Sequence, residues 1–430
     1  MNRVYCNGIG VASPFGKGVK PYMEAFKEGK TAIGVSNSLK RVPGIFLGSE
    51  VEPVHLQELS AYDSELGIKR FALTQVALLE ALEQSGQNTP YNNQKRVGIF
   101  LGSGSYLSEF SLSRQAGYLS NPLPNQDDFR FDSKDFLLRA LALPGLMPAG
   151  DYDRFMRERL LAQPSSLLQF TRNLVGGSGE IQLINNLCVS SLQAIGQAYR
   201  SLQNGDCDIA VVGGVEELSI ISYLTFHRLG VYSQAELPEA GCRPFDVNRK
   251  GIVLGEGAAF MVLSREKQGA CAEILAYASG NNCYHLTDSA PDGEGLYAVM
   301  AKCVKRAGVK PDLIIAHGTG TRSNDPSESK AILRLFSDHE GPYVQSIKSR
   351  IGHTLAAAGI FNVVTGILQA QSAFVGPTLG LTQPDSECQV RHVPAAGLSM
   401  KLGSILCNAA GFGGFNASMI LDVSLASNPG

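Results

Sequence analysis

The sequence predicts a large α/β protein, and three features carry that prediction. Short apolar runs alternate with longer stretches of helical periodicity along most of the chain. Many of the 47 glycines stand where an apolar run ends, as tight turns between strands and helices require. The alternation occurs in the first half of the 430 residues and again in the second. We therefore expect two α/β halves of similar size.

The chain opens with an expected strand over Val4–Gly10, followed by a turn and a helix over Lys20–Lys27. A second helix, over Ile68–Ser85, precedes the apolar run Arg96–Gly104, which is typical of a buried parallel strand. Residues 105–165 lose this rhythm and contain scattered prolines, so we expect an insertion there.

The clearest βαβ unit of the sequence follows the insertion. A strand is predicted over Ile181–Asn185, then a helix over Val189–Gln203 that Gly205 ends, then a strand over Asp208–Gly214. A strand, a helix and a strand joined in this way favour parallel pairing within one sheet.

The second half repeats the pattern. Its predicted elements are a strand over Ala258–Leu263, a helix over Tyr297–Ala307 and a strand over Leu313–Ala316. We therefore divide the chain into an N-terminal half, 1–255, and a C-terminal half, 256–430.

Composition excludes several classes of function. A formal charge of −2 with 44% hydrophobic and 18% charged residues gives no field for gathering nucleic acid or anionic lipid. No export signal is visible, and polar residues such as His353 and Asn362 interrupt the apolar stretch Ile351–Phe374, so no membrane span is expected. Nine scattered cysteines without C-x-x-C pairing indicate neither disulfides nor a zinc site, so we expect a cytoplasmic protein without a metal.

Cys188 lies between the strand that ends near Asn185 and the helix that follows. A sulfur at a helix N-terminus is favoured as thiolate by the helix dipole, which is one way to obtain a nucleophile at neutral pH. The alternative is that Cys188 is a small buried hydrophobic residue, as most cysteines are.

Two histidines follow predicted strands of the second half. His317 closes Leu313–Ala316 and precedes the turn Gly318–Thr321, and strand ends are where α/β sites gather. Lys348 and His353 flank a second junction, where a strand is expected to end at the lysine and a helix of small residues to begin at the histidine. Either histidine could instead be a structural residue, and the lysine a surface one.

A last glycine loop, Gly411–Asn416, follows the predicted strand Ser404–Cys407 and could surround a ligand with its backbone amides. It lacks the G-K-[ST] ending of a nucleotide P-loop, and the first βα unit has no G-x-G-x-x-G. No G-x-S-x-G nucleophile elbow occurs either.

Taken together, these segments resemble the β-ketoacyl-acyl-carrier-protein synthases, the thiolase-fold condensing enzymes of fatty acid and polyketide synthesis. They also occur in the same order along the chain as in that family. The resemblance covers nearly the whole chain, and its landmarks are Val4–Gly16, Asn186–Ser191, Arg243–Asp246, Gly251–Gly257, His317–Thr321, Lys348–His353 and Gly411–Asn416. It implies a five-layer αβαβα sandwich built from two similar halves.

The resemblance also implies a mechanism. Cys188 would receive the acyl chain as a thioester, while His317 and His353 bond to the thioester carbonyl of a malonyl-type extender. Decarboxylation would give an enolate that attacks the acyl-Cys carbonyl. The oxyanion would rest on the backbone N–H groups of Cys188 and Phe412. No cofactor is implied, because phosphopantetheine on an acyl carrier protein delivers the substrates.

Further residues receive roles by the same resemblance. Lys348, paired with Glu328, would organise the site electrostatically, and Phe412 would act as a gate with its flanking glycines as hinges. The residues expected to contact substrate are Thr319, Thr321, Asp325, Glu328, Gly413 and Phe415.

Several positions depart from the family pattern. Leu187 stands before the nucleophile where Ala or Gly is usual, so the turn must accommodate a larger side chain. Phe415 replaces a usual Thr, Ala409-Ala410 a common Ser-Phe, and Arg350-Ile351 a common Met-Thr. These departures favour a specialised synthase, of the polyketide or polyene kind, over a housekeeping one.

Two alternatives remain open. A thiolase would share the fold, and Cys407 lies near the last glycine loop, but thiolases carry a different sequence at His317–Gly320. A non-catalytic partner resembling a chain-length factor would lack the nucleophilic cysteine, which this chain keeps. Family members are dimers, so we expect a homodimer or a heterodimer with such a partner.

The carrier proteins of related systems are acidic, which suggests a local basic patch on the synthase. Arg249, Lys250 and Arg350 are candidates for this patch. The alternative is that these side chains form an ordinary solvated face.

Overall fold

The computed structural model describes residues 2–37, 46–59, 69–86, 91–104, 163–218, 220–336 and 341–427. Nearly all of the predicted insertion at 105–165 lies outside these residues. At its end the chain enters α6 (Pro164–Val175), a helix that the sequence did not reveal.

Most of the described strands form one large mixed sheet, in the order β12-β11-β15-β16-β10-β1-β9-β8-β5, with β6 and β7 along the free side of β5. The bounds of its main strands are β1 Tyr5–Ser13, β5 Tyr91–Ser103, β6 Gly176–Ser178, β7 Ile181–Ile184, β8 Ile209–Glu216, β9 Gly257–Ser264, β10 Ala272–Asn281, β11 Leu313–Ile315, β12 Tyr343–Gln345, β15 Ser404–Gly411 and β16 Phe415–Asp422.

The sheet consists of two half-sheets with the same strand order. In the first, β7, β5 and β8 are parallel, and β9 and β1 follow antiparallel. In the second, β12, β11 and β15 are parallel, and β16 and β10 follow antiparallel. The half-sheets join where β1 and β10 pair through Tyr5 with Glu273 and Cys6 with Ala272. The expectation of two similar halves is confirmed.

One prediction about these halves needs correction. We assigned the strand of residues 258–263 to the C-terminal half, yet β9 lies between β8 and β1 in the first half-sheet. The first half-sheet therefore continues to Ser264, past the predicted division at 255. The apolar run of a buried strand does not reveal whether the strand returns antiparallel to its own sheet, which is what β9 does.

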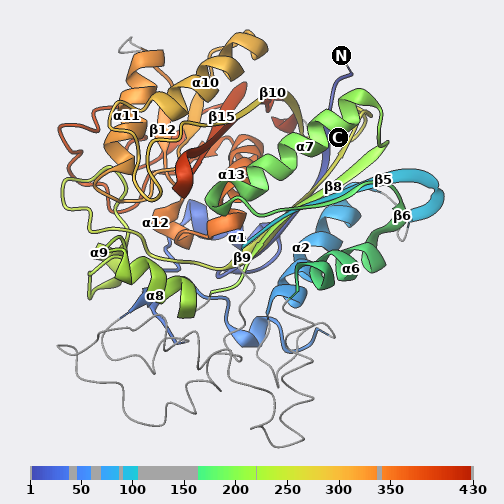
Figure 1. Ribbon diagram of the computed structural model, residues 1–430, viewed down its shortest axis with the longest axis horizontal. Coiled ribbons are helices and arrows are strands. Elements are labelled where there is room, and N and C mark those ends of the chain that lie inside the picture. Colours follow the sequence, from blue (N-terminus) through green and yellow to red (C-terminus); the bar gives the residue numbers. More distant parts are fainter. Residues whose placement is uncertain are drawn as a thin grey trace, which may run out of the picture.

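Helices form three of the five layers, which Figure 1 shows from lower right to upper left. The first pair, α2 and α6, covers the outer face of the first half-sheet, α7 and α13 lie between the half-sheets, and α10 and α11 cover the outer face of the second. Their bounds are α2 Arg70–Gln84, α7 Ser190–Asn204, α10 Glu294–Ala307, α11 Asn324–Leu335 and α13 Ala358–Ser372. The predicted αβαβα sandwich is therefore confirmed.

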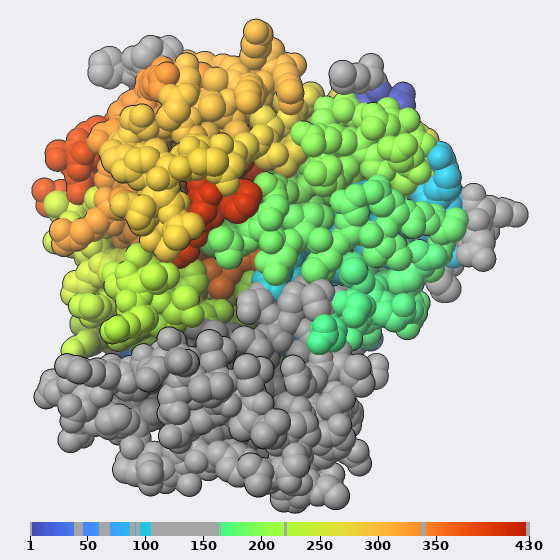
Figure 2. All heavy atoms as spheres, viewed as in Figure 1, coloured from blue at the N-terminus to red at the C-terminus, as the bar shows by residue number. Residues whose placement is uncertain are grey.

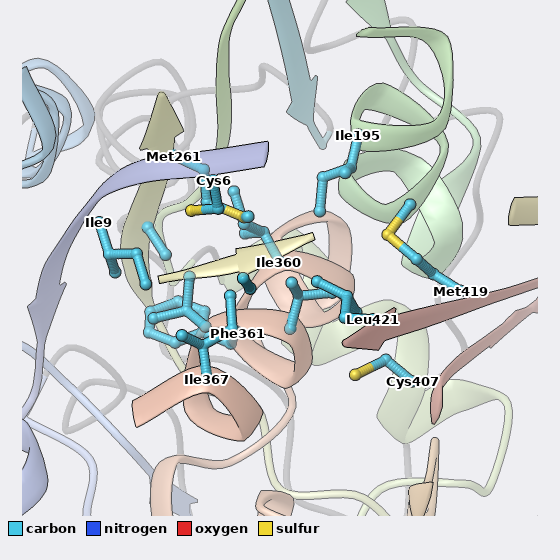
Figure 3. Close-up of a cluster of buried hydrophobic side chains, with 14 of the residues drawn as sticks. Cys6, Ile9, Ile195, Met261, Ile360, Phe361, Ile367, Cys407, Met419 and Leu421 are labelled. Atoms are coloured by element: carbon cyan, nitrogen blue, oxygen red, sulfur yellow. The ribbon is translucent and has the colours of Figure 1, made fainter. Parts of the chain in front are cut away.

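Three hydrophobic clusters fill the spaces between these layers. The central cluster joins α7 and α13 to both half-sheets, and Figure 3 shows Ile195, Phe361, Met419 and Met261 among its side chains. The outer clusters lie under α2 and under α10. Because burial of apolar surface dominates folding energetics, the central cluster fixes how the two halves meet.

Close approach of α7 and α13 depends on a missing side chain. A Cβ atom on Gly359 would lie 2.6 Å from the Cβ of Leu192 and 2.7 Å from its backbone nitrogen.

Residues Leu355–Ser372 are long and apolar enough to span a membrane, but 83% of that stretch is buried inside the protein. The stretch is therefore the core helix of the sandwich.

Shorter elements complete the described fold. They are α1 Val19–Lys27, α8 Ile220–Arg228, α9 Pro238–Gly241, α12 Lys348–Ile351, β2 Gly16–Lys17, β3 Gly34–Val35, β4 Leu47–Gly48, β13 Phe374–Val375, β14 Leu398–Ser399, and the 3-10 turns η1 Pro53–His55, η4 Leu187–Val189, η5 Leu355–Ala357, η6 Phe412–Gly414 and η7 Ser424–Ser427.

The junction around His353 differs from the prediction. Strand β12 ends at Gln345, Lys348 begins the one-turn helix α12, and α13 begins at Ala358. His353 therefore lies in the connection between two helices, where it forms an isolated β-bridge with Leu254.

Candidate active site

Cys188 lies on η4, between the end of β7 and the first residue of α7. Ser190 holds this elbow, because its Oγ accepts a hydrogen bond from the Asn186 N–H at 2.9 Å and donates one to the Leu187 carbonyl at 2.5 Å. Cys188 itself is 7% exposed. The elbow therefore presents a nearly buried thiol at the N-terminal end of α7.

Leu187 shows how the elbow accommodates its larger side chain. Its φ is 55°, in the left-handed region where a residue with a Cβ is strained, and its side chain is 46% exposed. The leucine is thus directed outward, so it does not fill the space around the sulfur.

The protonation state of Cys188 differs from our expectation of a thiolate. Burial raises the pKa of the thiol to about 12, and the charge of Glu216 adds to that rise. The positive charge of Lys348 acts in the opposite direction, but burial outweighs it. The resting residue is therefore a thiol at neutral pH, and a base must accept its proton during attack.

His317 and His353 come together in the interior. Their ring centroids are 5.2 Å apart with the ring planes at 81°, and the residues are 4% and 1% exposed. Burial, with the charge of Lys348, lowers both pKa values well below 6.5, so both imidazoles are neutral at pH 7. The Nδ1 of His353 has no hydrogen-bond partner among the described residues.

The two halves meet at this pair. His353 donates its backbone N–H to the Val253 carbonyl at 2.7 Å and accepts the Gly255 N–H at 3.1 Å. The turn η5, just after His353, contacts η4 with Cys188. The fold thus brings the turn η4, which carries Cys188, against the segment that follows His353.

Lys348 connects the thiol and the histidines electrostatically. Its Nζ donates to the His317 carbonyl and lies 3.5 Å from the His317 Nδ1. Burial lowers the pKa of Lys348 to about 8, and the charge of Glu328 opposes this fall. An ammonium group can only donate, so the Nδ1 of His317 accepts and its proton resides on Nε2.

The predicted pairing of Lys348 with Glu328 is not a direct ion pair in the described residues. The carboxylate of Glu328 instead accepts the backbone N–H groups of His317 at 2.9 Å and Gly318 at 2.8 Å, and the side-chain amide of Asn408 at 3.0 Å. Lys348 and Glu328 therefore hold the same turn from different sides, one through its carbonyl and the other through its amides.

Asp325 holds the next part of that turn. Its carboxylate accepts the backbone N–H of Thr319 at 3.0 Å, of Gly320 at 3.1 Å and of Phe245 at 2.8 Å. The hydroxyls of Thr319 and Thr321 lie 2.9 Å apart beside it. Asp325 and Glu328 are both fully buried, so the geometry assigns them to positioning the turn, whereas we had expected substrate contact.

The last glycine loop lies against the nucleophile. A Cβ on Gly411 would lie 3.5 Å from the backbone nitrogen of Cys188. The Phe412 ring stacks on Phe226 of α8, with centroids 5.6 Å apart and planes at 25°. Gly413 has a φ of 74°, which permits the sharp turn after the phenylalanine.

Phe415 begins β16 opposite Gly411 and Asn281, and its half-buried side chain packs against the central cluster. In Figure 2 the red C-terminal part of the chain reaches the surface between green and yellow segments.

Two of the three basic candidates for a docking patch are buried. Arg249 is 5% exposed and pairs with Asp385 at 2.6 Å, while Arg350 is fully buried. Lys250 is exposed, and so is Arg322, which the sequence reading did not single out. Sequence reasoning also missed Glu216, a buried acid at the end of β8, and an acid closing a buried strand was the available signal. Burial raises the pKa of Glu216 to about 8, and its carboxylate, once ionised, raises the pKa of Cys188.

Across the described ranges, no group of three or more His, Cys, Asp or Glu side chains is arranged to hold a metal ion. All nine cysteines are free.

Comparison with known families agrees with this geometry. The family model described as Beta-ketoacyl synthase, N-terminal domain, matches residues 173–269, and Beta-ketoacyl synthase, C-terminal domain, matches residues 271–382. The first match contains Cys188, and the second contains both histidines and Lys348.

Curated relatives match along nearly their full length. A putative polyketide beta-ketoacyl synthase 1 from Streptomyces virginiae is 30% identical over 433 residues, covering 98% of each chain. A 3-oxoacyl-[acyl-carrier-protein] synthase 2 from Coxiella burnetii is also 30% identical, covering 97% of this chain and 98% of the relative.

Solved structures match as completely. A chain from the complex of a type II PKS acyl-carrier protein with its ketosynthase bound to the hexaketide has a TM-score of 0.79 at 26% identity, covering 98% of this chain and 99% of that one. A beta-ketoacyl synthase from Burkholderia phymatum, at 23% identity, shares the fold with a TM-score of 0.78, covering 98% and 100%. With relatives 30% identical over almost their whole length, the chain belongs to the β-ketoacyl synthase family.

Proposed function

We propose that this protein is an acyltransferase of the 3-oxoacyl-[acyl-carrier-protein] synthase type, which joins acyl units by decarboxylative Claisen condensation. The observation that carries the proposal is the convergence of the Cys188 elbow with two neutral imidazoles, His317 and His353, whose rings are 5.2 Å apart. Membership of the family supports the same chemistry. A non-catalytic partner subunit would not need this set.

The first half-reaction loads the enzyme. The Cys188 sulfur attacks the thioester carbonyl of an acyl donor, and the carrier thiol leaves with a proton. Because the pKa of the buried Cys188 thiol is about 12, a base must accept its proton as the new C–S bond forms. Both histidines are neutral at pH 7, and the Nδ1 of His353 has no hydrogen-bond partner among the described residues.

The second half-reaction releases carbon dioxide from a malonyl extender. Its C–C bond to the carboxylate breaks, and the electron pair enters an enolate whose oxygen needs hydrogen-bond donors. The Nε2–H of His317 is available as such a donor, because Lys348 occupies the Nδ1 side. The enolate carbon then attacks the acyl-Cys carbonyl, and the Cys188 sulfur leaves. Backbone N–H groups of Cys188 and Phe412 are the proposed oxyanion donors.

We further propose an acidic acyl carrier protein as the partner that delivers both substrates. Exposed Lys250 and Arg322 flank the turn with the Thr319 and Thr321 hydroxyls. That turn is joined to the segment of Lys250 by a hydrogen bond from the Gly251 N–H to the Gly320 carbonyl. Positive charge beside a polar turn suits a phosphopantetheine arm, and a similar chain was solved with an acyl-carrier protein.

A dimer is also proposed, either with a second copy or with a chain-length-factor-like subunit. In the described part of the chain, β7 pairs on one side only, with β5. Its residues are exposed or half-buried, including Ile181 at 39%. An apolar strand with a free edge is a site for pairing with another chain.

The pathway and location are proposals too. The relatives include polyketide beta-ketoacyl synthases and a 3-oxoacyl-[acyl-carrier-protein] synthase 2, and the departures at Leu187 and Phe415 favour a specialised substrate. Nine free cysteines suit a reducing cytoplasm, and the chemistry proposed needs no cofactor.

Intact-protein mass spectrometry tests the proposal. After incubation with acyl-carrier thioesters of different length and unsaturation, the wild-type chain should gain one acyl mass on Cys188, and Cys188→Ala should gain none. With malonyl-carrier protein added, the wild type should release carbon dioxide and elongate its acyl chain. Elongation by Cys188→Ala would contradict the mechanism, and a wild-type chain without any adduct would favour the partner-subunit alternative.

A further inference from the structure

Arg350 is a buried cation without an acidic partner. It is fully buried, and in the described residues no carboxylate lies within ion-pair distance of it. Its guanidinium stands 4.6 Å from the ring centroid of Phe26, and its Nε has no partner. Burying a charge in this way is costly unless other groups replace the lost water.

Three backbone carbonyls take that place. One guanidinium nitrogen donates to the carbonyls of Phe26 at 3.3 Å and Lys30 at 3.4 Å, and the other donates to Pro377 at 3.2 Å. Phe26 belongs to the last turn of α1, where the helix dipole favours a cation. The guanidinium therefore bridges the end of α1, in the first half of the chain, to the segment around Pro377 in the second.

The backbone of α12 is held between the same two segments. The Arg350 carbonyl accepts the Ala32 N–H at 2.7 Å, and the Ser349 carbonyl accepts the Thr31 hydroxyl at 2.9 Å. On the other side, the Ser349 hydroxyl accepts the Leu379 N–H at 2.9 Å. These contacts hold α12 between the segment around Thr31 and the segment around Leu379. The Arg350 side chain bonds to both of these segments as well.

Helix α12 and the residues next to it carry two of the proposed catalytic groups. Lys348 is the first residue of α12 and reaches His317, and His353 lies two residues after Ile351, where the helix ends. We propose that Arg350 is a positioning residue for the decarboxylation half-reaction, locking α12 so that Lys348 and His353 keep their orientation toward the extender. This inference rests on the proposed function and adds a residue that does not itself touch substrate.

A purely space-filling role does not account for this side chain. A methionine would fill similar volume without a desolvated charge, whereas arginine supplies several donors in a rigid fork that can bond to separated carbonyls. Gly376 leaves room for the fork, since a Cβ there would approach Arg350 Nη2 to 2.9 Å. The site is thus built around the guanidinium.

The test compares Arg350→Met and Arg350→Lys with the wild type. Arg391→Met is the matched control, because exposed Arg391 also stands over an aromatic ring, Tyr343, at 3.9 Å and donates to a carbonyl, that of Gly341, at 3.2 Å. For each protein we would measure carbon dioxide release from malonyl-carrier protein, acyl loading of Cys188 by intact mass, and thermal unfolding.

Arg350→Met should lose about tenfold or more of its decarboxylation rate, because small displacements of catalytic groups have effects of that order. Its acyl loading should stay within about twofold of wild type, since that half-reaction depends less on α12. Arg350→Lys should recover part of the loss, because it keeps the charge but has one donor point where arginine has a fork. Arg391→Met should behave as wild type.

Two results would overturn the role of Arg350. One is a folded Arg350→Met enzyme that decarboxylates at the wild-type rate. The other is an equal loss of loading and decarboxylation that follows the loss of folded protein in both Arg350 variants. The wild type is measured in the same assays, so an inactive wild type would refute the proposed function, and an active wild type with an unaffected Met variant would refute this inference alone.

Discussion

Replacing Glu328 by Gln should disturb the position of His317 while leaving every proposed reacting group in place. The side chain accepts three N–H donors, from His317, Gly318 and Asn408, and an ionised carboxylate suits all three because it has only acceptor atoms. Burial raises the pKa of Glu328, and the N–H donors of Gly318 and His317 oppose that rise. Glutamine keeps one acceptor oxygen but directs an NH2 group toward a donor.

The magnitude follows from the number of bonds affected. A buried hydrogen bond to a charged group is worth about 1.5–3 kcal/mol, and one N–H left unsatisfied costs about 1–3 kcal/mol. We therefore expect Glu328→Gln to lower the free energy of unfolding by about 2–4 kcal/mol. The turn before Thr319 should shift, and decarboxylation should fall by about 10²-fold, as a 1 Å displacement of a catalytic group does.

Glu80→Gln provides the control for this prediction. Glu80 also accepts two backbone N–H groups, from Val11 at 2.9 Å and Val19 at 2.8 Å, at the junction of β1 and α1. It should lose stability of a similar order while decarboxylating at the wild-type rate per folded molecule. Chemical denaturation and carbon dioxide release measure the two quantities. Equal loss of decarboxylation in both variants, or none in Glu328→Gln, would refute the reasoning.

Two further predictions concern the remaining polar groups. His353→Ala should still load an acyl chain on Cys188 but should lose malonyl decarboxylation, because one enolate donor is gone; unchanged carbon dioxide release would remove its proposed role. The pKa of Lys348 is about 8, lowered from 10.5 by burial, so its ammonium is lost as pH rises through about 8, and the decarboxylation rate should fall there. Lys348→Arg, which stays charged, should shift or abolish that alkaline decline, and a pH–rate profile that is flat from 7 to 9 in the wild type would contradict the argument. Glu328→Gln should move the decline to lower pH, since the charge of Glu328 supports the ammonium.

The sequence predicted the elements whose signal is local. The helix expected at Ile68–Ser85 is α2, and the strand–helix–strand unit around Cys188 is β7, α7 and β8, with Gly205 in the left-handed conformation that ends α7. Apolar periodicity and a terminal glycine were sufficient for these elements because each is a property of one segment.

Elements whose signal depends on partners were missed. Helix α11 carries Asp325 and Glu328, acids that suggest an exposed surface, although both are fully buried because the turn after β11 supplies the N–H groups they need. Strands β10 and β16 pair with each other along eight residue positions, and neither was identified, since the first contains a glycine and polar residues and the second follows a glycine loop without a break. Whether such a residue is buried, or such a strand forms, depends on the segment it packs against and not on its own sequence.

The same reasoning applies to the protonation of Cys188. The sequence places Cys188 before α7, and a helix N-terminus alone would favour a thiolate. The burial of Cys188, however, depends on how η4, η5 and the last glycine loop pack together. The burial that raises the pKa of this thiol also keeps the two imidazoles neutral, which is the state that can accept a proton from sulfur. One desolvated environment therefore prepares both partners of the proposed proton transfer.

Both histidines lie outside the helices and the named strands, so regular secondary structure does not fix their rings. His317 is held through its own backbone by Glu328 and Lys348, and His353 follows the short helix α12 that Arg350 fastens. In each case a buried charge bonds to backbone groups, and charge-assisted bonds are stronger than neutral ones in a low dielectric. Burial of Glu328, Lys348 and Arg350 costs desolvation free energy, and the bonds these groups make fix the orientation of the two imidazoles. This arrangement explains why substitutions at groups that do not touch substrate should also reduce decarboxylation.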